Sequence, residues 1–293
     1  MYDKFFGSFL LNKNALTQDE LKDILKHMQN TRIKIGTIAM KEKHMTGAQV
    51  EEVFQLQKQT DKRFGEIAID KGYLREEQVE KLLEFQSEES NLQLGQAAID
   101  LGYLNYEQLD KELNSFETES GLSAIQLKTL EEGDTDKIIK AFIDFEGSAN
   151  SQMYYDYVSL FLRNIIRFLD QQPWIEINSA DDLDEIITAY QYMQNDITVF
   201  TGIGITPESI YEISEKFAGI PVRGDMELAE SALMELLNLH NGIFTVNMSD
   251  QGMTFNMRPP EVTRESSLDD MKNGHQICIN TAIGKINLLL SPF

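Results

Sequence analysis

The side chains best suited to chemistry stand on one predicted helix, over residues 225–241. At about 100° per residue, Ser231, Glu235 and Asn238 fall within about 60° of one another on this helix. A different side of the helix must face a core, because it holds Ala229, Ala232, Leu233, Leu236 and Leu237. A carboxylate and an amide therefore lie together where a partner can reach them. On spacing alone, a solvated polar face is the stronger interpretation.

An amide and a carboxylate suit different tasks. A neutral amide can hydrogen-bond a water molecule without adding charge, and a carboxylate can bind a cation of a partner. The sequence has no phosphate-binding glycine loop followed by a helix, no nucleophile elbow and no Cys/His pair. Cys278, in a strand-like segment, and His240, on the side of its helix away from Glu235, are predicted to be structural.

This part of the chain resembles the CheC, CheX and FliY chemotaxis phosphatases. Ser231, three residues, Glu235, two residues and Asn238 are followed by Pro259-Pro260. The pattern of that family is Asp or Ser, then Glu, then Asn at the same spacing, with a later Pro. The stretch of 20 or 21 residues between Asn238 and the prolines is slightly shorter than in the family. The resemblance covers roughly residues 150–293.

The resemblance implies hydrolysis of the aspartyl-phosphate of a CheY-type response regulator. By resemblance, Asn238 would orient the attacking water, Glu235 would pair with a lysine of the regulator, and Ser231 would support the site. The Mg²⁺ ion would belong to the regulator, so this chain would need no cofactor of its own. The likeness to CheX also implies a homodimer.

A second copy of the motif, as in CheC, is expected to be inactive here. The equivalent earlier helix offers Tyr157, Phe161 and Asn164. Phe161 stands where the family has Glu. The resemblance therefore implies one site, as in CheX.

Residues 151–293 predict a two-layer α/β domain, because helices are interleaved with strands that favour antiparallel pairing. A broad apolar face predicts a helix from Met153 to a stop at Pro173. Thr206-Pro207-Glu208 predicts the start of another helix, which ends at Gly219. The predicted strands are Glu185–Tyr192 and Ile197–Ile205, then two hairpins, one joining Ile243–Asn247 to Met253–Met257 and one joining Gln276–Thr281 to Ile286–Leu290.

The first 116 residues contain an internal repeat. Gly7, Gly36, Gly65 and Gly95 are 29, 29 and 30 residues apart, in similar surroundings. Each copy predicts two short helices, and in the third copy Gly72 supplies the left-handed residue that ends the first of them. One copy cannot bury its apolar stripe alone, so the copies must stack. We therefore expect an all-helical repeat domain over residues 1–116.

Two neighbouring copies resemble the N-terminal domain of type II secretion ATPases, including its cyclic di-GMP-binding version, the MshEN domain. Lys34-Ile35-Gly36 runs to Gln57, and after five residues Arg63-Phe64-Gly65 runs to Gln86. Lys43 departs from the pattern, which has Gly there. The resemblance implies cyclic di-GMP as a possible ligand, bound by Lys34, Gly36, Gln57, Arg63, Gly65 and Gln86. The alternative is that the glycines permit close helix packing and that the two basic side chains are solvated.

Composition narrows the choice of partners. The 293 residues carry a net charge of −22 and one cysteine. A field of that sign repels phosphate backbones and anionic lipid, so neither nucleic acid nor membrane is an expected partner. No apolar run of about 18 residues occurs, and the N-terminus lacks the pattern of a signal peptide. With a single cysteine, these features predict a cytoplasmic protein.

A linker with one short helix is predicted between the two domains. Residues 117–150 begin and end with polar, glycine-containing stretches, and Gly133-Asp134-Thr135-Asp136 begins a short helix that ends near Phe145. The predicted organisation is therefore a repeat domain at 1–116, a linker at 117–150 and an α/β domain at 151–293.

These patterns favour a two-part signalling protein, in which a sensing or docking module of helical repeats precedes the phosphatase domain. The alternative is a non-catalytic signalling adaptor that binds a partner protein or cyclic di-GMP. The presence of both Glu235 and Asn238 favours the enzyme.

Overall fold

The chain forms two compact units, Met1–Gly133 and Asp134–Phe293. The computed structural model describes residues 2–86, 92–145, 150–171, 173–175, 186–195, 197–264 and 274–292. The boundary between the units falls inside the predicted linker. That segment holds two short helices rather than one, α9 (Ala124–Glu132) and α10 (Thr135–Phe142). The predicted flexible stretch at 146–149 lies outside the described residues.

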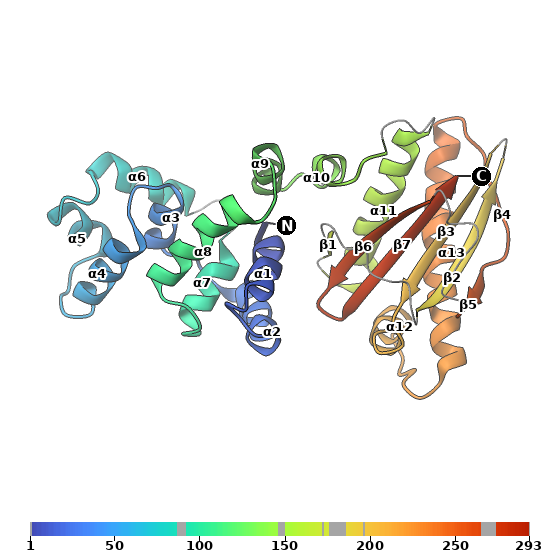
Figure 1. Ribbon diagram of the computed structural model, residues 1–293, viewed down its shortest axis with the longest axis horizontal. Helices are drawn as coiled ribbons and strands as arrows, with labels where there is room; N and C mark the ends of the chain where they lie inside the picture. The colour runs from blue at the N-terminus through green and yellow to red at the C-terminus, as the bar shows by residue number, and fades with distance from the viewer. Residues whose placement is uncertain are drawn as a thin grey trace. The chain divides into compact units, whose positions relative to one another are not determined.

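The first unit is helical, as the repeat predicts (Figure 1). Each of the four copies contributes two helices, and α9 follows them. The helices are α1 (Tyr2–Asn12), α2 (Gln18–His27), the 3₁₀ turn η1 (Met28–Asn30), α3 (Ile35–Lys41), α4 (Gly47–Gln57), α5 (Phe64–Asp70), α6 (Glu76–Phe85), α7 (Gln93–Asp100) and α8 (Tyr106–Glu119).

All four copies end their first helix with the same left-handed turn. The residue in that conformation is Asn14 (φ 55°), Lys43 (φ 56°), Gly72 (φ 73°) or Gly102 (φ 78°). In each copy its N–H donates to the carbonyl oxygen three residues earlier, at distances of 2.8–3.0 Å. Lys43, where the sequence pattern lacks its glycine, thus adopts the glycine's backbone conformation.

The four repeat glycines lie where the two helices of a copy touch. A Cβ atom placed on Gly36 would come within 2.7 Å of Val50, and one on Gly65 within 2.8 Å of Val79. Gly7 and Gly95 stand against Leu21 and Leu109 in the same way. In every copy the neighbour is the residue fourteen positions later. Close helix packing therefore accounts for these glycines without a ligand.

One carboxyl group in the first unit should make its stability depend on pH. Asp3 on α1 is buried, and its Oδ1 has no hydrogen-bond partner within the described ranges. Burial raises the pKa of Asp3 to about 6. The unfolded chain then releases the proton more readily than the folded one, so stability is lost as the pH rises from about 4 to about 6.

Asp3→Asn is expected to remove this loss. At pH 7 the variant should be more stable than the wild type by about 2–3 kcal/mol, and at pH 4 the two should differ little. Urea unfolding followed by circular dichroism between pH 4 and 7 measures the effect. Asp19→Asn, at an exposed position of α2, is the matched control. An unchanged pH slope in Asp3→Asn would contradict the assignment.

The second unit packs helices on an antiparallel sheet, with α11 and α13 along one face (Figure 1). Its remaining helices are α11 (Ser151–Leu169), α12 (Ile210–Ala218) and α13 (Met226–Asp250). The strand order is β1-β6-β7-β3-β2-β4, and β5 also pairs with β2. The strands are β1 (Trp174–Ile175), β2 (Ile187–Gln194), β3 (Thr198–Ile205), β4 (Asn256–Met257), β5 (Glu261–Thr263), β6 (His275–Thr281) and β7 (Gly284–Pro292).

Most of the predicted elements of this unit are present. Four predicted strands correspond to β2, β3, β6 and β7, although the predicted start of the first, Glu185, lies outside the described residues. The helix expected from Thr206 begins at Ile210, after a turn in which the N–H groups of Ser209 and Ile210 donate to the Thr206 carbonyl oxygen at 3.0 and 3.1 Å. The short strands β1 and β5 were not predicted.

The hairpin predicted from Ile243–Asn247 to Met253–Met257 is wrong. Residues 243–247 continue α13, which runs to Asp250, and only Asn256–Met257 forms a strand, paired with β2. Two features of the structure explain why the helix continues past Asn241. Phe244 and Met248 are buried on the core side, one turn apart. The side chain of Asn241 is held by other elements, so it does not compete for the helix backbone.

Candidate functional site

The long helix α13 positions the predicted stripe. Its first turn is capped by Asp225, whose carboxylate accepts from the Leu228 N–H at 3.0 Å. Ser231 and Glu235 are exposed and Asn238 is half-buried. The apolar residues predicted to face a core are all buried: Ala229, Ala232, Leu233, Leu236 and Leu237. The helix thus presents an exposed carboxylate one turn from a half-buried amide at the edge of its packed side.

The three stripe residues differ in what binds them. Ser231 Oγ donates to the carbonyl oxygen of Glu227 at 2.7 Å, one turn earlier in the same helix. Glu235 makes no hydrogen bond or ion pair with any residue that the structure describes. Its carboxylate is therefore available to a cation from outside the chain.

Asn238 is held from beneath by the sheet. Its Oδ1 accepts a hydrogen bond from Nε2 of Gln191 on β2 at 3.0 Å. An amide oxygen has two lone pairs, so Oδ1 can still accept a proton of a water molecule, and Nδ2 can donate to a phosphoryl oxygen. Sequence reasoning did not identify Gln191. The signal that could have indicated it is a single amide among the inward-facing residues of this strand, which are Ile187, Ala189, Gln191 and Met193.

The positions of the second motif lie in the interior of the unit. Tyr157, Phe161 and Asn164 on α11 are buried against α13. The Tyr157 hydroxyl donates to Oδ1 of Asn241 at 2.7 Å, and the amide of Asn164 lies 3.0 Å from Nδ1 of His240. These side chains bind neighbouring helices, and none of them is presented to a partner.

His240 is a buried structural residue, as predicted. Its ring packs edge-on against Tyr157 and Phe161, with centroids 4.4 and 5.0 Å away. Burial lowers the pKa of His240 to about 3, so the ring is neutral at physiological pH. Cys278 is also buried, as predicted.

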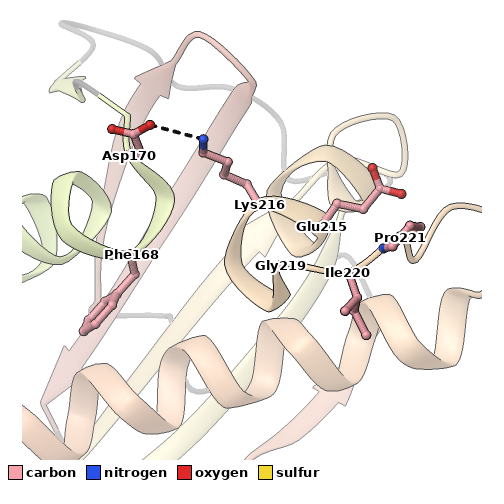
Figure 2. A pocket seen from close by; sticks show the side chains of 7 residues that line it. All are labelled: Phe168, Asp170, Glu215, Lys216, Gly219, Ile220 and Pro221. Carbon is pink, nitrogen blue, oxygen red and sulfur yellow. Dashed lines mark hydrogen bonds and ion pairs between the residues drawn. The ribbon is translucent and has the colours of Figure 1, made fainter.

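A hollow lies between α11 and α12 (Figure 2). It has a volume of about 540 Å³ and is lined by Phe168, Asp170, Glu215, Lys216, Gly219, Ile220 and Pro221. Its charged groups already have partners: Lys216 pairs with Asp170 at 3.3 Å, and Glu215 accepts from the N–H groups of Val222 and Arg223. Those backbone bonds lower the pKa of Glu215. Neither Glu235 nor Asn238 lines this hollow.

The first unit brings its two predicted nucleotide motifs into contact. A Cβ atom on Gly36 would also lie 2.9 Å from the ring of Phe64. Phe64 stands between Arg63 and Gly65 in the sequence of the second motif. Nε2 of Gln86 donates to the carbonyl oxygen of Ile33 at 2.5 Å, beside Lys34. The Lys34 ammonium is paired with Asp100 at 2.7 Å. Arg63 is exposed, and Gln57 is half-buried at the end of α4.

The described ranges offer neither a metal site of protein side chains nor a membrane span. No group of three or more His, Cys, Asp or Glu side chains there could hold a metal ion. No helix there combines the length and apolar character that crossing a bilayer requires.

Comparisons with known proteins found similar solved structures for about half of the chain. No family model and no curated protein matches the sequence. Among solved structures, chemotaxis protein CheX from Vibrio vulnificus is 11% identical, with 50% of this chain and 100% of that chain covered and a TM-score of 0.42. A chemotactic CheC-like protein from Shewanella oneidensis MR-1 is 17% identical, with 49% and 99% covered and a TM-score of 0.40.

A third solved structure is a complex. It is the CheX-CheY-BeF3-Mg complex from Borrelia burgdorferi, at 12% identity, with 48% and 97% covered and a TM-score of 0.38. Each of these three solved structures contains a CheX or CheC-like chemotaxis protein.

Proposed function

We propose that residues 134–293 form a phosphatase for the aspartyl-phosphate of a CheY-type response regulator. The observation that carries the proposal is the amide of Asn238. It is fixed by Gln191 at the edge of the packed side of α13, one turn from the exposed carboxylate of Glu235. The spacing of Ser231, Glu235 and Asn238 with the later prolines, similar to the CheC, CheX and FliY pattern, supports it.

The reaction is hydrolysis of an acyl phosphate. A water oxygen bonds to phosphorus while the bond between phosphorus and the regulator's aspartyl oxygen breaks. The aspartate leaves with that electron pair, and the water proton passes to solvent, giving inorganic phosphate. Oδ1 of Asn238 accepts one proton of the water and so directs a water lone pair at phosphorus. Glu235 pairs with a lysine of the regulator, and the Mg²⁺ ion is the regulator's own.

The test is the decay of each phosphorylated CheY-type regulator of the same organism, with and without the protein. Accelerated release of phosphate supports the proposal. No acceleration with any of these regulators would overturn it. The adaptor alternative would then gain support if the unphosphorylated or phosphorylated regulator still bound.

Glu235→Gln is expected to weaken binding of the phosphorylated regulator about tenfold, because the neutral amide loses the charge that pairs with a lysine. The rate at saturating regulator should change much less, since the water is held by Asn238. Steady-state kinetics at several regulator concentrations separate KM from kcat. Asp250→Asn makes the same charge change at the exposed far end of α13 and is the control. A fall confined to kcat would contradict this role.

For the helical repeats we propose a sensing or docking module. Helix packing explains its glycines. On α6, the apolar residues Leu83 and Phe85 have 52% and 46% of their surface exposed, which suits docking of a protein. Calorimetric titration with cyclic di-GMP distinguishes the two roles. Binding of the nucleotide would support sensing, and its absence would leave docking of a protein. A homodimer is also proposed, and sedimentation velocity measures it.

A further inference from the structure

We propose that Gln191 is a positioning residue that sets the orientation of the Asn238 amide for catalysis. The inference rests on the proposed phosphatase function. It concerns a side chain on the sheet, outside the motif and 47 residues from Asn238 in the sequence.

Gln191 is a polar residue in an apolar place. It occupies an inward position of β2, and only 1% of its surface is exposed. A buried amide costs free energy unless its donors and acceptors are satisfied. The question is therefore where its hydrogen bonds go.

The bonds of Gln191 leave it one orientation. Its Nε2 donates to the backbone carbonyl of Arg258 at 2.7 Å. A carbonyl can only accept, so the nitrogen of the Gln191 amide must lie on that side. Its Oε1 then faces α13 and accepts from Nδ2 of Asn241 at 2.8 Å.

Further bonds lock the arrangement. Asn241 Nδ2 also donates to Oγ1 of Thr201 at 2.9 Å. The Thr201 hydroxyl in turn donates to the backbone carbonyl oxygen of Gln191 at 2.9 Å. The Tyr157 hydroxyl donates to the other end of the Asn241 amide at 2.7 Å. Each of these side chains is buried. A network in which every member is satisfied holds its side chains rigidly.

The remaining donor of Gln191 reaches Asn238. Because Nε2 donates at 3.0 Å, the facing atom of Asn238 must be its oxygen. The Asn238 amide is thereby kept from rotating by 180°, and its NH₂ group points away from Gln191. The same Nε2 also binds Arg258, the residue before Pro259, which a proline favours in an extended conformation. One glutamine amide thus ties together the asparagine and the proline end of the motif.

An unrestrained amide could rotate by 180° and exchange the positions of its oxygen and its NH₂ group. An NH₂ group in the place of the oxygen would donate to the water lone pair that must attack phosphorus. Fixing the oxygen toward Gln191 keeps an acceptor for the water proton. Gln191 should therefore affect the chemical step and leave binding of the regulator unchanged.

The experiment compares wild-type protein with Gln191→Met, which has a similar volume but no donor, in the dephosphorylation assay. We expect kcat to fall about tenfold and KM to stay within about twofold. The side-chain amide resonances of Asn238, assigned with Asn238→Ala, should shift and gain mobility in Gln191→Met. Ser214→Ala is the control for stability, because it removes a buried hydrogen bond to the Ala229 carbonyl of α13, away from Asn238.

The outcomes separate the two proposals. A wild type that is inactive on every CheY-type regulator overturns the phosphatase function and the catalytic role of Gln191 with it. An active wild type with unchanged kcat in Gln191→Met, or with a loss confined to KM, overturns only the positioning role. If Gln191→Met does not fold, Gln191→Asn takes its place: it keeps an amide but is too short by one methylene to reach both Arg258 and Asn238, so the same kcat loss is expected.

Discussion

Asn238→Ala is expected to lower the rate of regulator dephosphorylation at saturation by about a hundredfold, the usual cost of removing one preorganised hydrogen-bonding group from a transition state. Alanine leaves no atom to accept the water proton. KM should stay within about twofold, because the proposed contact with the regulator's lysine belongs to Glu235. The measurement is release of phosphate from the phosphorylated regulator under saturating and single-turnover conditions.

Asn247→Ala is the matched control for this loss. Asn247 is an exposed asparagine on the same helix, about two and a half turns away and on the opposite side from Asn238. Its truncation should leave the rate unchanged. Equal activity in wild type and Asn238→Ala would contradict the site, even if the protein proved to be a phosphatase. Folding of both variants is checked by circular dichroism, since Asn238 gives up one hydrogen bond to Gln191.

The stripe on α13 could be predicted from sequence because helical periodicity is local information. Apolar residues at regular spacing defined the packed side, and Glu235 and Asn238 followed from their angles. The end of the same helix could not be predicted. Asn241-Gly242 is a typical stop signal, yet Asn241 is buried and bound to Gln191 and Thr201, and the helix continues for nine residues beyond it. Tertiary contacts override the local signal there.

The support beneath Asn238 depends on which strand lies under the helix. Gln191 was not identified from the sequence, because nothing local links a polar residue in an inward strand position to a helix 47 residues later. The repeat shows a similar division. Its spacing predicted the helix pairs, whereas the close packing of Gly36 and Gly65 against Val50 and Val79 needed the three-dimensional distances. Lys43 shows that the turn itself survives loss of its glycine.

Gly47→Ala is expected to lower the free energy of unfolding more than any other substitution considered, although the repeat pattern does not mark Gly47 as important. The equivalent residues of the other copies are Gln18, Glu76 and Tyr106, so no shared pattern marks this position. A Cβ on Gly47 would lie 2.4 Å from the carbonyl oxygen of Tyr106 and 2.8 Å from the Cα of Glu107. Both are backbone atoms at the capped start of α8, where they cannot rotate away.

Alanine must therefore push α4 and α8 apart. The separation would also stretch the bond from the Gly47 N–H to Asp110, now 2.8 Å. We expect a loss of about 3 kcal/mol or more in the free energy of unfolding, at the upper end of overpacking effects. Urea unfolding followed by circular dichroism measures it. The single tryptophan, Trp174, lies in the second unit, so its fluorescence follows that unit separately.

Gly242→Ala gives the matched comparison, because the same substitution should have the opposite sign. Gly242 is within α13, and a Cβ there would meet no atom within 4 Å. Replacing a helical glycine in open space by alanine stabilises a helix by about 1 kcal/mol. If Gly47→Ala cost no more than about 1 kcal/mol, α4 and α8 could separate at little expense, and the repeat domain would be less tightly packed than these distances require.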